Sequence, residues 1–137
     1  MNIVFISLGS NIGDKENYLL QARNKLNQLP NTKLKKCSQI INTKAMDYTD
    51  QDDFLNQVVE LYTELTPNEL LHELKIIEKD LGRIFRFDKG PREIDLDILL
   101  YNDSIVNTEY LNIPHHSIQS RPFIKELLLS INPSLKE

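Results

Sequence analysis

The apolar run IVFISL at residues 3–8 constrains the fold more than any other segment of the sequence. It is rich in β-branched residues and lacks the alternation of apolar and polar side chains that a half-buried strand shows. A run of this kind is typical of a strand covered on both faces, at the centre of a sheet. We therefore predict a central strand that begins close to residue 1.

The remaining patterns predict three helices and three further strands. Apolar residues repeat at helical spacing over residues 15–29, and Pro30 prevents the helix from continuing. A second helix begins at the capping box of residues 66–69, which has proline at the first helical position, and Gly82 is its natural stop. Strands are expected over residues 33–41, 54–65 and 94–100, and a last short helix over residues 120–131.

The order strand, helix, strand, strand, helix, strand is that of the ferredoxin-like βαββαβ fold. The predicted fold class is therefore α/β (α+β), a two-layer sandwich with an antiparallel sheet and a short C-terminal helix. Because 137 residues without an internal linker or repeat suit one globular unit, we expect a single domain over residues 1–137. This fold hosts many unrelated activities, so the function has to be inferred from the site.

Composition excludes several classes of protein. The one cysteine, Cys37, cannot form an internal disulfide, and the start of the sequence lacks the zones of a secretory signal, so a cytoplasmic location is expected. No apolar run approaches the roughly 20 residues that cross a bilayer, so no membrane partner is expected. The four glycines form neither a GxxxxGK[ST] nor a GxGxxG loop, so any nucleotide must bind in another way.

Charge is distributed unevenly along the sequence. The net charge of −4 argues against a protein that coats nucleic acid. Residues 83–92, which we call the basic loop, nevertheless carry +3, which leaves −7 for the rest of the chain. A small polyanion would be attracted to this loop, although a solvated loop without a ligand is the simpler alternative. The long segment over residues 42–53 has no periodicity and is also a candidate for function.

Asp95 and Asp97 form the most informative pair of residues. In the predicted strand over residues 94–100 both carboxylates point to one face, with their Cα atoms about 7 Å apart. Two such carboxylates repel each other unless a cation lies between them, and their oxygens suit Mg²⁺, which takes one or two carboxylates together with substrate phosphates. An exposed strand face is the alternative, but the surrounding residues are apolar, so we favour a metal site.

The basic loop leads directly into this strand. The positive charge of the loop, whose Arg92 is only three residues from Asp95, would act together with a divalent metal to neutralise the charge that phosphoryl transfer develops. Arginine also grips phosphate in a bidentate manner better than lysine does. Because Gly82 and Gly90 bracket the loop, it could close over a bound nucleotide and exclude water.

Two other groups of residues are candidates for ligand contacts. His115, His116 and Arg121 could bind phosphate or a base, and plain hydrogen bonding within the loop is the alternative. A zinc site is not favoured, because the sequence has too few other His and Cys residues to complete it. Phe54, Asn56 and Phe123 could hold a flat heterocycle between two rings and an amide, although aromatic residues are more often part of a core.

In these motifs the sequence resembles the 6-hydroxymethyl-7,8-dihydropterin pyrophosphokinases of folate biosynthesis. The likeness covers nearly the whole chain, and its motifs are LGSN at residues 8–11, FLN at 54–56, GPREIDLDILL at 90–100, and IPHH at 113–116 followed by Arg121. The resemblance implies an ATP-dependent diphosphotransferase of the ferredoxin-like fold. Such an enzyme moves the β,γ-diphosphoryl group of ATP to the hydroxymethyl oxygen of the pterin and releases AMP.

The resemblance also implies roles for individual residues. Two Mg²⁺ ions would be held by Asp95 and Asp97, the transferring group would be clamped by Arg83 and Arg92, and Asp97 would polarise the hydroxyl group. The residues implied to contact ATP are Lys75, Glu78, Arg92, Ile98, His115, His116 and Arg121. The residues implied to contact the pterin are Thr43, Met46, Phe54, Asn56 and Phe123. The partners would be ATP and the pterin, with no nucleic acid, and a monomer is expected.

This sequence departs from the family pattern at a few positions. Lys89 stands where a tryptophan is common, the basic loop is one residue shorter, Tyr110 replaces an arginine and Lys75 replaces a glutamine.

Two other functions remain open from the residues alone. A ligand-binding or RNA-binding module without catalysis would place a basic face on the sheet, and a metal-dependent phosphohydrolase would leave Phe54, Asn56 and Phe123 unexplained.

Overall fold

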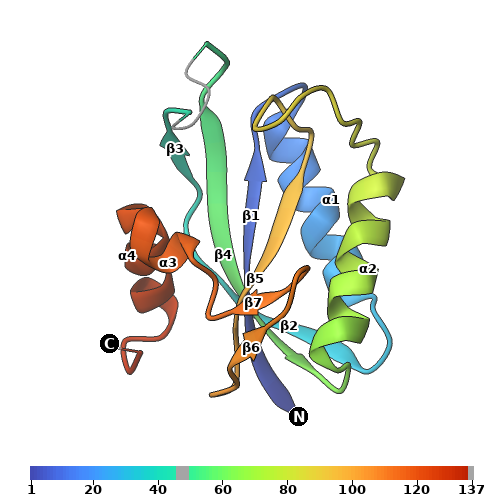
Figure 1. Ribbon diagram of the computed structural model, residues 1–137, viewed down its shortest axis with the longest axis vertical. Coiled ribbons are helices and arrows are strands. Elements are labelled where there is room, and N and C mark those ends of the chain that lie inside the picture. The colour runs from blue at the N-terminus through green and yellow to red at the C-terminus, as the bar shows by residue number, and fades with distance from the viewer. Residues whose placement is uncertain (46–49, 136–137) are drawn as a thin grey trace.

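A computed structural model of the chain describes residues 1–45 and 50–135 (Figure 1). The strands are β1 (Asn2–Ser10), β2 (Thr32–Cys37), β3 (Ile41–Thr43), β4 (Phe54–Thr63), β5 (Asp95–Tyr101), β6 (Val106–Asn107) and β7 (Asn112–Ile113). The helices are α1 (Lys15–Asn27), α2 (Pro67–Asp80), α3 (Ser117–Ser120) and α4 (Pro122–Ile131). Among the described residues, no helix is long and apolar enough to span a membrane.

The main sheet is antiparallel, in the order β2-β4-β1-β5, with β3 also paired to β4 (Figure 1). The predicted central strand is confirmed, because β1 pairs along its length with β4 on one edge and with β5 on the other. The prediction of a mixed α/β fold with an antiparallel sheet is also confirmed. The predicted strand over residues 33–41 is divided between β2 and β3, and the last predicted helix is confirmed as α4, which follows the short helix α3.

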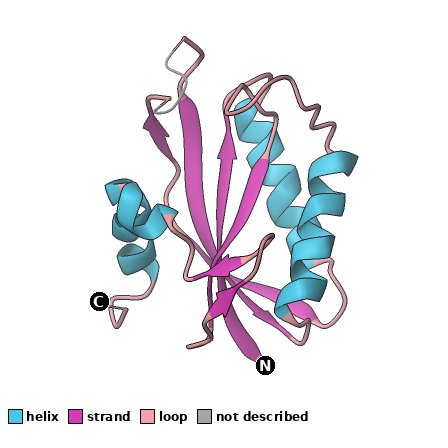
Figure 2. Cartoon of the chain, viewed as in Figure 1, coloured by secondary structure: helices cyan, strands magenta, loops and turns pink. Residues whose placement is uncertain are grey.

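The two faces of the sheet are covered to different extents (Figures 1 and 2). On one face, α1 packs on β1 and α2 packs on β5, and Val4, Ile6 and Leu8 of β1 are buried in the larger core cluster. On the other face, α4 covers only part of the sheet, with Phe5 of β1 in the smaller cluster beneath it. The rest of that face lies beyond α4, which leaves room there for a site.

One residue of β5 lies on a face that the sequence pattern did not predict. Alternation predicts that Leu100 shares a face with Ile98, but the register against β1 shifts between Phe5 and Ile6. Ile98 therefore packs into the larger cluster, whereas Leu99 and Leu100 both pack with the smaller one under α4. The prediction for Leu100 is wrong because a β-bulge inserts one unpaired residue and interrupts the alternation.

The end of α2 determines where the basic loop begins. Gly82 has a φ of +95°, and its N–H donates to the carbonyl of Lys79, while the N–H of Arg83 donates to the carbonyl of Glu78. This pair of hydrogen bonds is the Schellman motif, in which a residue in the left-handed region ends the helix. The chain therefore turns at Gly82, and Arg83 lies next to Glu78 and the start of β5.

We expect Gly82→Ala to lower the free energy of unfolding by about 1 kcal/mol, because an alanine is strained at a positive φ. No atom lies within 4 Å of the position that its Cβ would occupy, so the cost comes from the backbone alone. Urea denaturation followed by circular dichroism measures the change. Lys79→Ala, one turn earlier in the same helix, is the control and should change stability by less than about 0.5 kcal/mol. Equal stability of Gly82→Ala and the parent chain would contradict the prediction.

Candidate active site

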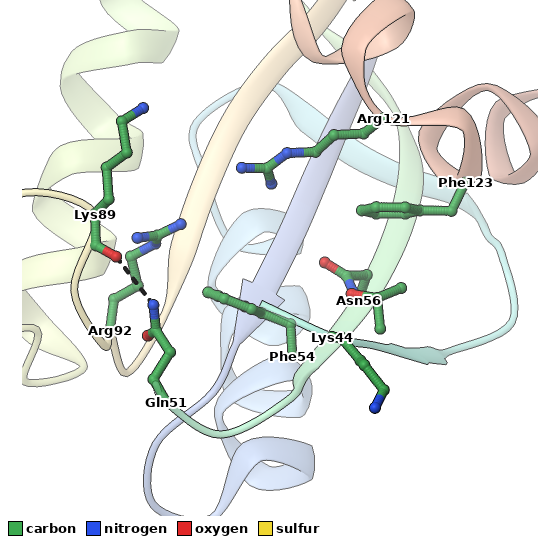
Figure 3. Close-up of a pocket in the computed structure, with 9 residues that line it drawn as sticks. Lys44, Gln51, Phe54, Asn56, Lys89, Arg92, Arg121 and Phe123 are labelled. Atoms are coloured by element: carbon green, nitrogen blue, oxygen red, sulfur yellow. Dashed lines mark hydrogen bonds between the residues drawn. The ribbon is translucent and has the colours of Figure 1, made fainter. Parts of the chain in front are cut away.

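Two cavities lie at the end of the sheet where β1 ends and β4 and β5 begin. The smaller, which we call the ring pocket, has a volume of about 10 Å³ and is lined by Thr43, Lys44, Gln51, Phe54, Asn56, Lys89, Arg92, Arg121 and Phe123 (Figure 3). The larger, which we call the acidic cavity, has a volume of about 190 Å³ and is lined by Ser7, Leu8, Gly9, Phe54, Asn56, Asp95, Asp97, His115, His116, Ser117, Arg121 and Ile124. Phe54, Asn56 and Arg121 line both, so the two cavities share a wall.

The floor of the acidic cavity consists of small residues of β1. Gly9 is paired with Asp95 and Ser7 with Asp97 in the sheet register, so these residues lie on the face that carries the carboxylates. A Cβ built on Gly9 would lie 3.5 Å from Oδ1 of Asn56 and 3.6 Å from the Phe54 ring. Larger side chains at these positions would fill the cavity. The small residues at the end of β1 therefore keep the sheet face open in front of Asp95 and Asp97.

Asp95 is neutralised by the two arginines that the sequence predicted as phosphate ligands. Its Oδ1 lies 3.0 Å from Nη1 of Arg83, and its Oδ2 lies 3.4 Å from Nε of Arg92. The same Nη1 of Arg83 lies 3.0 Å from Oε1 of Glu78. The arginines and carboxylates thus form one connected network at the start of β5.

Asp97 has a different environment, because neither Arg83 nor Arg92 forms an ion pair with it in the described part of the chain. Burial, together with the negative charges of Asp95 and Glu78, raises its pKa from an ordinary value of 3.8 to about 7. Its side chain still keeps 36% of its surface exposed, which leaves it open to the cavity. A carboxylate with a raised pKa that faces a cavity lacks sufficient positive charge around it, and a bound cation would supply that charge.

Glu78 has a structural role that the sequence did not predict. Its side chain is almost completely buried, and Oε2 accepts a hydrogen bond of 2.8 Å from the N–H of Leu96. Because β5 is an edge strand, this N–H would otherwise lack a partner in the sheet. Burial raises the pKa of Glu78, and the hydrogen bond from Leu96 and the charge of Arg83 oppose the rise. Glu78 therefore fastens α2 to β5 and also holds Arg83.

His115 faces Asp97 in its neutral form. Its Nδ1 accepts a hydrogen bond from the N–H of Ser117 at 3.1 Å, so in the neutral ring we assign the proton to Nε2, which lies 3.7 Å from Oδ1 of Asp97. Burial and the neighbouring His116 lower the pKa of His115 to about 4. The rings of His115 and His116 are stacked, with centroids 4.4 Å apart. At neutral pH, His115 therefore presents an uncharged N–H donor to Asp97.

The aromatic residues predicted to bind a flat ring come together in the ring pocket. In Figure 3 the rings of Phe54 and Phe123 lie on either side of a gap, with the Asn56 side chain beside it. Asn56 Nδ2 donates to Oγ1 of Thr43 at 2.6 Å, and the guanidinium of Arg92 lies 4.9 Å from the centroid of Phe54. With a volume of about 10 Å³, the pocket has room for only about one water molecule, so the surrounding groups must move apart to admit a heterocycle.

Other predicted residues lie at the margin of the site or outside the described part of the chain. Lys75 lies on α2, is 59% exposed and lines neither cavity, although its Nζ is 3.8 Å from Glu78. The side chain of Ile98 is buried in the core on the opposite face of the sheet, so only its main chain is near the site. Met46 lies outside the described residues.

The sequence analysis did not assign several residues that line or support the site: Ser7, Lys44, Gln51, Lys89, Ser117 and Ile124, and Asn11 behind them. For Ser7 a signal was present, because alternation along β1 places it on the same face as Gly9. For Asn11 and Gln51 no local pattern exists, since their partners are distant in the sequence.

The acidic cavity offers oxygen ligands of the type that Mg²⁺ prefers. Within the described part of the chain, no group of three His, Cys, Asp or Glu side chains is arranged to hold a metal. Mg²⁺ nevertheless binds in many sites through one or two carboxylates, with waters and substrate phosphates completing the shell. Asp95 and Asp97, which face the cavity from alternate positions of one strand, fit this mode of binding.

Comparison with known proteins gives the same assignment as the geometry. Residues 5–133 match the profile of the 7,8-dihydro-6-hydroxymethylpterin-pyrophosphokinase (HPPK) family. The chain belongs to this family. It is therefore a pyrophosphokinase that acts with ATP on a pterin in folate biosynthesis, and the predicted family, enzyme class and reaction are confirmed.

Several pterin pyrophosphokinases and related proteins are similar over almost the whole chain. The 2-amino-4-hydroxy-6-hydroxymethyldihydropteridine pyrophosphokinase of Aquifex aeolicus is 42% identical over 135 residues, which are 98% of this chain and 83% of that protein. The enzyme of the same name from Bacillus subtilis is 45% identical over 130 residues, 95% of this chain and 78% of that protein. The folic acid synthesis protein fol1 of Pneumocystis carinii is 44% identical over 132 residues, only 18% of its own length.

The raised pKa of Asp97 predicts how the metal-free protein responds to pH. Because the folded pKa of about 7 lies above the ordinary value of 3.8, ionising Asp97 destabilises the folded state. The contribution of Asp97 to the free energy of unfolding is therefore fully present below about pH 4, and it is lost as the pH rises towards 7. We expect Asp97→Asn to raise the free energy of unfolding at pH 7.5 by about 1 kcal/mol, less than the full shift implies because part of the side chain is in water.

Thermal unfolding in the presence of a chelator, from pH 4 to pH 8, measures this effect. Asp103→Asn, at an exposed position in the turn after β5, is the control and should follow the parent chain. Addition of Mg²⁺ at pH 7.5 should stabilise the parent chain and have little effect on Asp97→Asn. If the stability of the parent chain and of Asp97→Asn depended on pH in the same way, the destabilisation would not come from ionisation of Asp97.

Proposed function

We propose that the pyrophosphokinase reaction takes place at the wall shared by the ring pocket and the acidic cavity. The observation that carries this proposal is the position of Arg92. Its guanidinium lies over the ring of Phe54, and its Nε lies 3.4 Å from Asp95, so one side chain touches the candidate pterin platform and the candidate metal ligand. A phosphoryl group that is transferred from the nucleotide to the pterin would therefore pass close to the guanidinium of Arg92.

The pterin is assigned to the ring pocket. The rings of Phe54 and Phe123 would stack on its two faces, because offset stacking of flat rings is favourable. Asn56 offers both a donor and an acceptor to the edge of the heterocycle, and its hydrogen bond to Thr43 fixes its orientation. Met46 is included in this pterin-binding set from the resemblance alone.

The triphosphate and two Mg²⁺ ions are assigned to the acidic cavity, with Asp95 and Asp97 as the protein's metal ligands. Bound Mg²⁺ would neutralise phosphate charge and orient the transferring group. The N–H of His115 would hold the carboxylate of Asp97 in place. His115, His116 and Arg121 lie along the cavity as further contacts to ATP, while Lys75, Glu78 and the main chain of Ile98 lie beyond the cavity as more distant ones.

The reaction itself requires positioning and neutralisation of charge. The hydroxymethyl oxygen of the pterin attacks the β-phosphorus, the bond to the α-phosphate oxygen breaks, and AMP leaves. Arg83 and Arg92 would leave Asp95 and bind the phosphate oxygens, where they offset the charge that develops in the transition state. We assign to Asp97 the polarisation of the attacking hydroxyl group.

The finer features of the fold and setting are also proposals. The strand order β2-β4-β1-β5, with α1 and α2 on one face, supports a ferredoxin-like βαββαβ unit, to which α4 adds cover on the second face. We further propose one domain over residues 1–137 that acts as a monomer in the cytoplasm, with the pterin and ATP as its partners.

An assay for pterin-dependent AMP formation tests the assignment of the site. We expect Asp97→Asn and Arg92→Ala each to lower kcat by at least about 100-fold, because each removes charge that is needed most in the transition state. Phe123→Ala should instead raise the KM for the pterin by about 10-fold or more and leave the KM for ATP within about twofold. Asp103→Asn is the control and should retain full activity. Normal turnover in Asp97→Asn or Arg92→Ala, with the fold intact, would refute the assignment.

A further inference from the structure

The strands β2 and β3 pair one after the other with the edge of β4 that faces away from β1 (Figure 1). Residues 38–40 lie between them, and we call this segment the junction. β3 is only three residues long, yet it carries Thr43, whose Oγ1 accepts a hydrogen bond of 2.6 Å from Nδ2 of Asn56. Because a shift of a strand by one residue turns each side chain to the other face of the sheet, this contact exists in one register only.

Side-chain hydrogen bonds fix the junction to β4. The N–H of Ser38 donates to the carbonyl of Val58 at 2.8 Å, and Oγ of Ser38 accepts from the N–H of Val58 at 2.9 Å, so the hydroxyl takes the place of a main-chain carbonyl. Nε2 of Gln57 donates to the carbonyl of Ser38 at 2.8 Å. Ser38 and Gln57 are almost completely buried, so loss of either side chain leaves a buried polar group without its partner.

Arg23 connects the junction to α1. Its Nη1 donates to Oε1 of Gln57 at 2.7 Å, and this contact orients the amide so that Nε2 faces Ser38. Arg23, Gln57 and Ser38 thus form one chain of hydrogen bonds, which we call the junction network. None of these three described residues lines the ring pocket or the acidic cavity, so the network acts on the proposed site only through other residues.

We propose that the three residues of the junction network are positioning residues that set the register of β3 on β4 and thereby hold Thr43 against the amide of Asn56. The inference rests on the proposed function, because it takes Asn56 as a ligand of the pterin. Thr43 accepts from one N–H of that amide, so it determines which edge of the amide the pterin meets. β3 alone makes three residue pairs with β4, and the junction network supplies the hydrogen bonds that select among the registers.

Two substitutions remove different hydrogen bonds of the junction network. Gln57→Glu keeps an acceptor for Arg23 but replaces the donor to the carbonyl of Ser38 by an oxygen. Ser38→Ala removes the acceptor of the Val58 N–H. We expect each of these junction variants to raise the dissociation constant of the pterin about fivefold or more, the factor that corresponds to loss of one hydrogen bond. Calorimetry with Mg²⁺ and α,β-methylene ATP measures it, since in this analogue a carbon replaces the bridging oxygen of the bond that would break.

Steady-state kinetics separate binding from the chemical step. Each junction variant should raise the KM for the pterin by a similar factor and leave kcat and the KM for ATP within about twofold, because the groups around Asp95 and Asp97 are unchanged. The matched control is Thr32→Val. It removes the hydrogen bond of 2.6 Å between the hydroxyl groups of Thr32 and Thr63, which joins β2 to β4 at the end remote from the junction. This control should bind the pterin as the parent chain does.

Nuclear magnetic resonance reports the register directly. In the parent chain, main-chain nuclear Overhauser effects should join each residue of β3 to the residue opposite it, for example Thr43 to Phe54. In both junction variants these effects should weaken or move by one residue, whereas the control should keep them. General loss of stability would not produce this difference, because the control weakens the same pair of strands that the junction connects to β3.

The outcomes separate this inference from the assignment of the site. A junction variant that folds and keeps the parental affinity for the pterin, or that loses affinity with the register intact, would overturn the inference. An equal loss of affinity in Thr32→Val would overturn it too. If neither buried substitution folds, Arg23→Met decides, because Arg23 is only half-buried, and the expected rise in the dissociation constant is about threefold.

Phe123→Ala tests the site separately. A raised KM for the pterin in that variant, with parental affinity in the junction variants, would overturn only the inference about β3. An unchanged KM in Phe123→Ala would refute the pterin site, and this inference with it.

Discussion

The buried hydrogen bond between Glu78 and the N–H of Leu96 is the interaction on which the fold and the site both depend. It gives the N–H of Leu96, at the edge of the sheet, a hydrogen-bond partner. It also places a carboxylate at the C-terminal end of α2, where the helix dipole disfavours a negative charge. Arg83 offsets this cost, because the Schellman motif at Gly82 returns the chain so that its guanidinium reaches Glu78 and Asp95. The helix that closes the edge of the sheet is thus followed by an arginine that reaches Asp95.

The second constraint is the incomplete cover of one sheet face. The apolar run of residues 3–8 supplies alternate residues to both faces of the sheet. Only the face covered by α1 and α2 is filled along its whole length. On the other face, α4 packs over Phe5, and the following positions are Ser7 and Gly9. The same strand therefore contributes a core residue and a cavity floor, and the change from large to small side chains along one face determines where a ligand can lie.

Much of this arrangement follows from local sequence patterns. Alternation places Asp95 and Asp97 on one face of β5 and Phe54 and Asn56 on one face of β4, and these faces meet because both strands pair with β1. The capping box and Gly82 mark the ends of α2 by local chemistry alone. The position of Leu100 was wrong because a bulge depends on packing between strands, and the roles of Glu78 and Asn11 were missed because their partners are 18 and 81 residues distant.

The carboxylates and arginines also explain how one structure can exist with and without its substrates. In the structure, Arg83 and Arg92 both pair with Asp95, while Asp97 keeps a raised pKa. In the proposed reaction, the cations of the nucleotide would replace the arginines at the carboxylates, and the arginines would become available to the phosphates. Asp95 would have a cationic partner in both states, so the change would require an exchange of partners at this carboxylate rather than the creation of an unpaired charge. The main chain of Arg92 is held by two hydrogen bonds to Asn11, so the exchange would require movement of the Arg92 side chain rather than of its backbone.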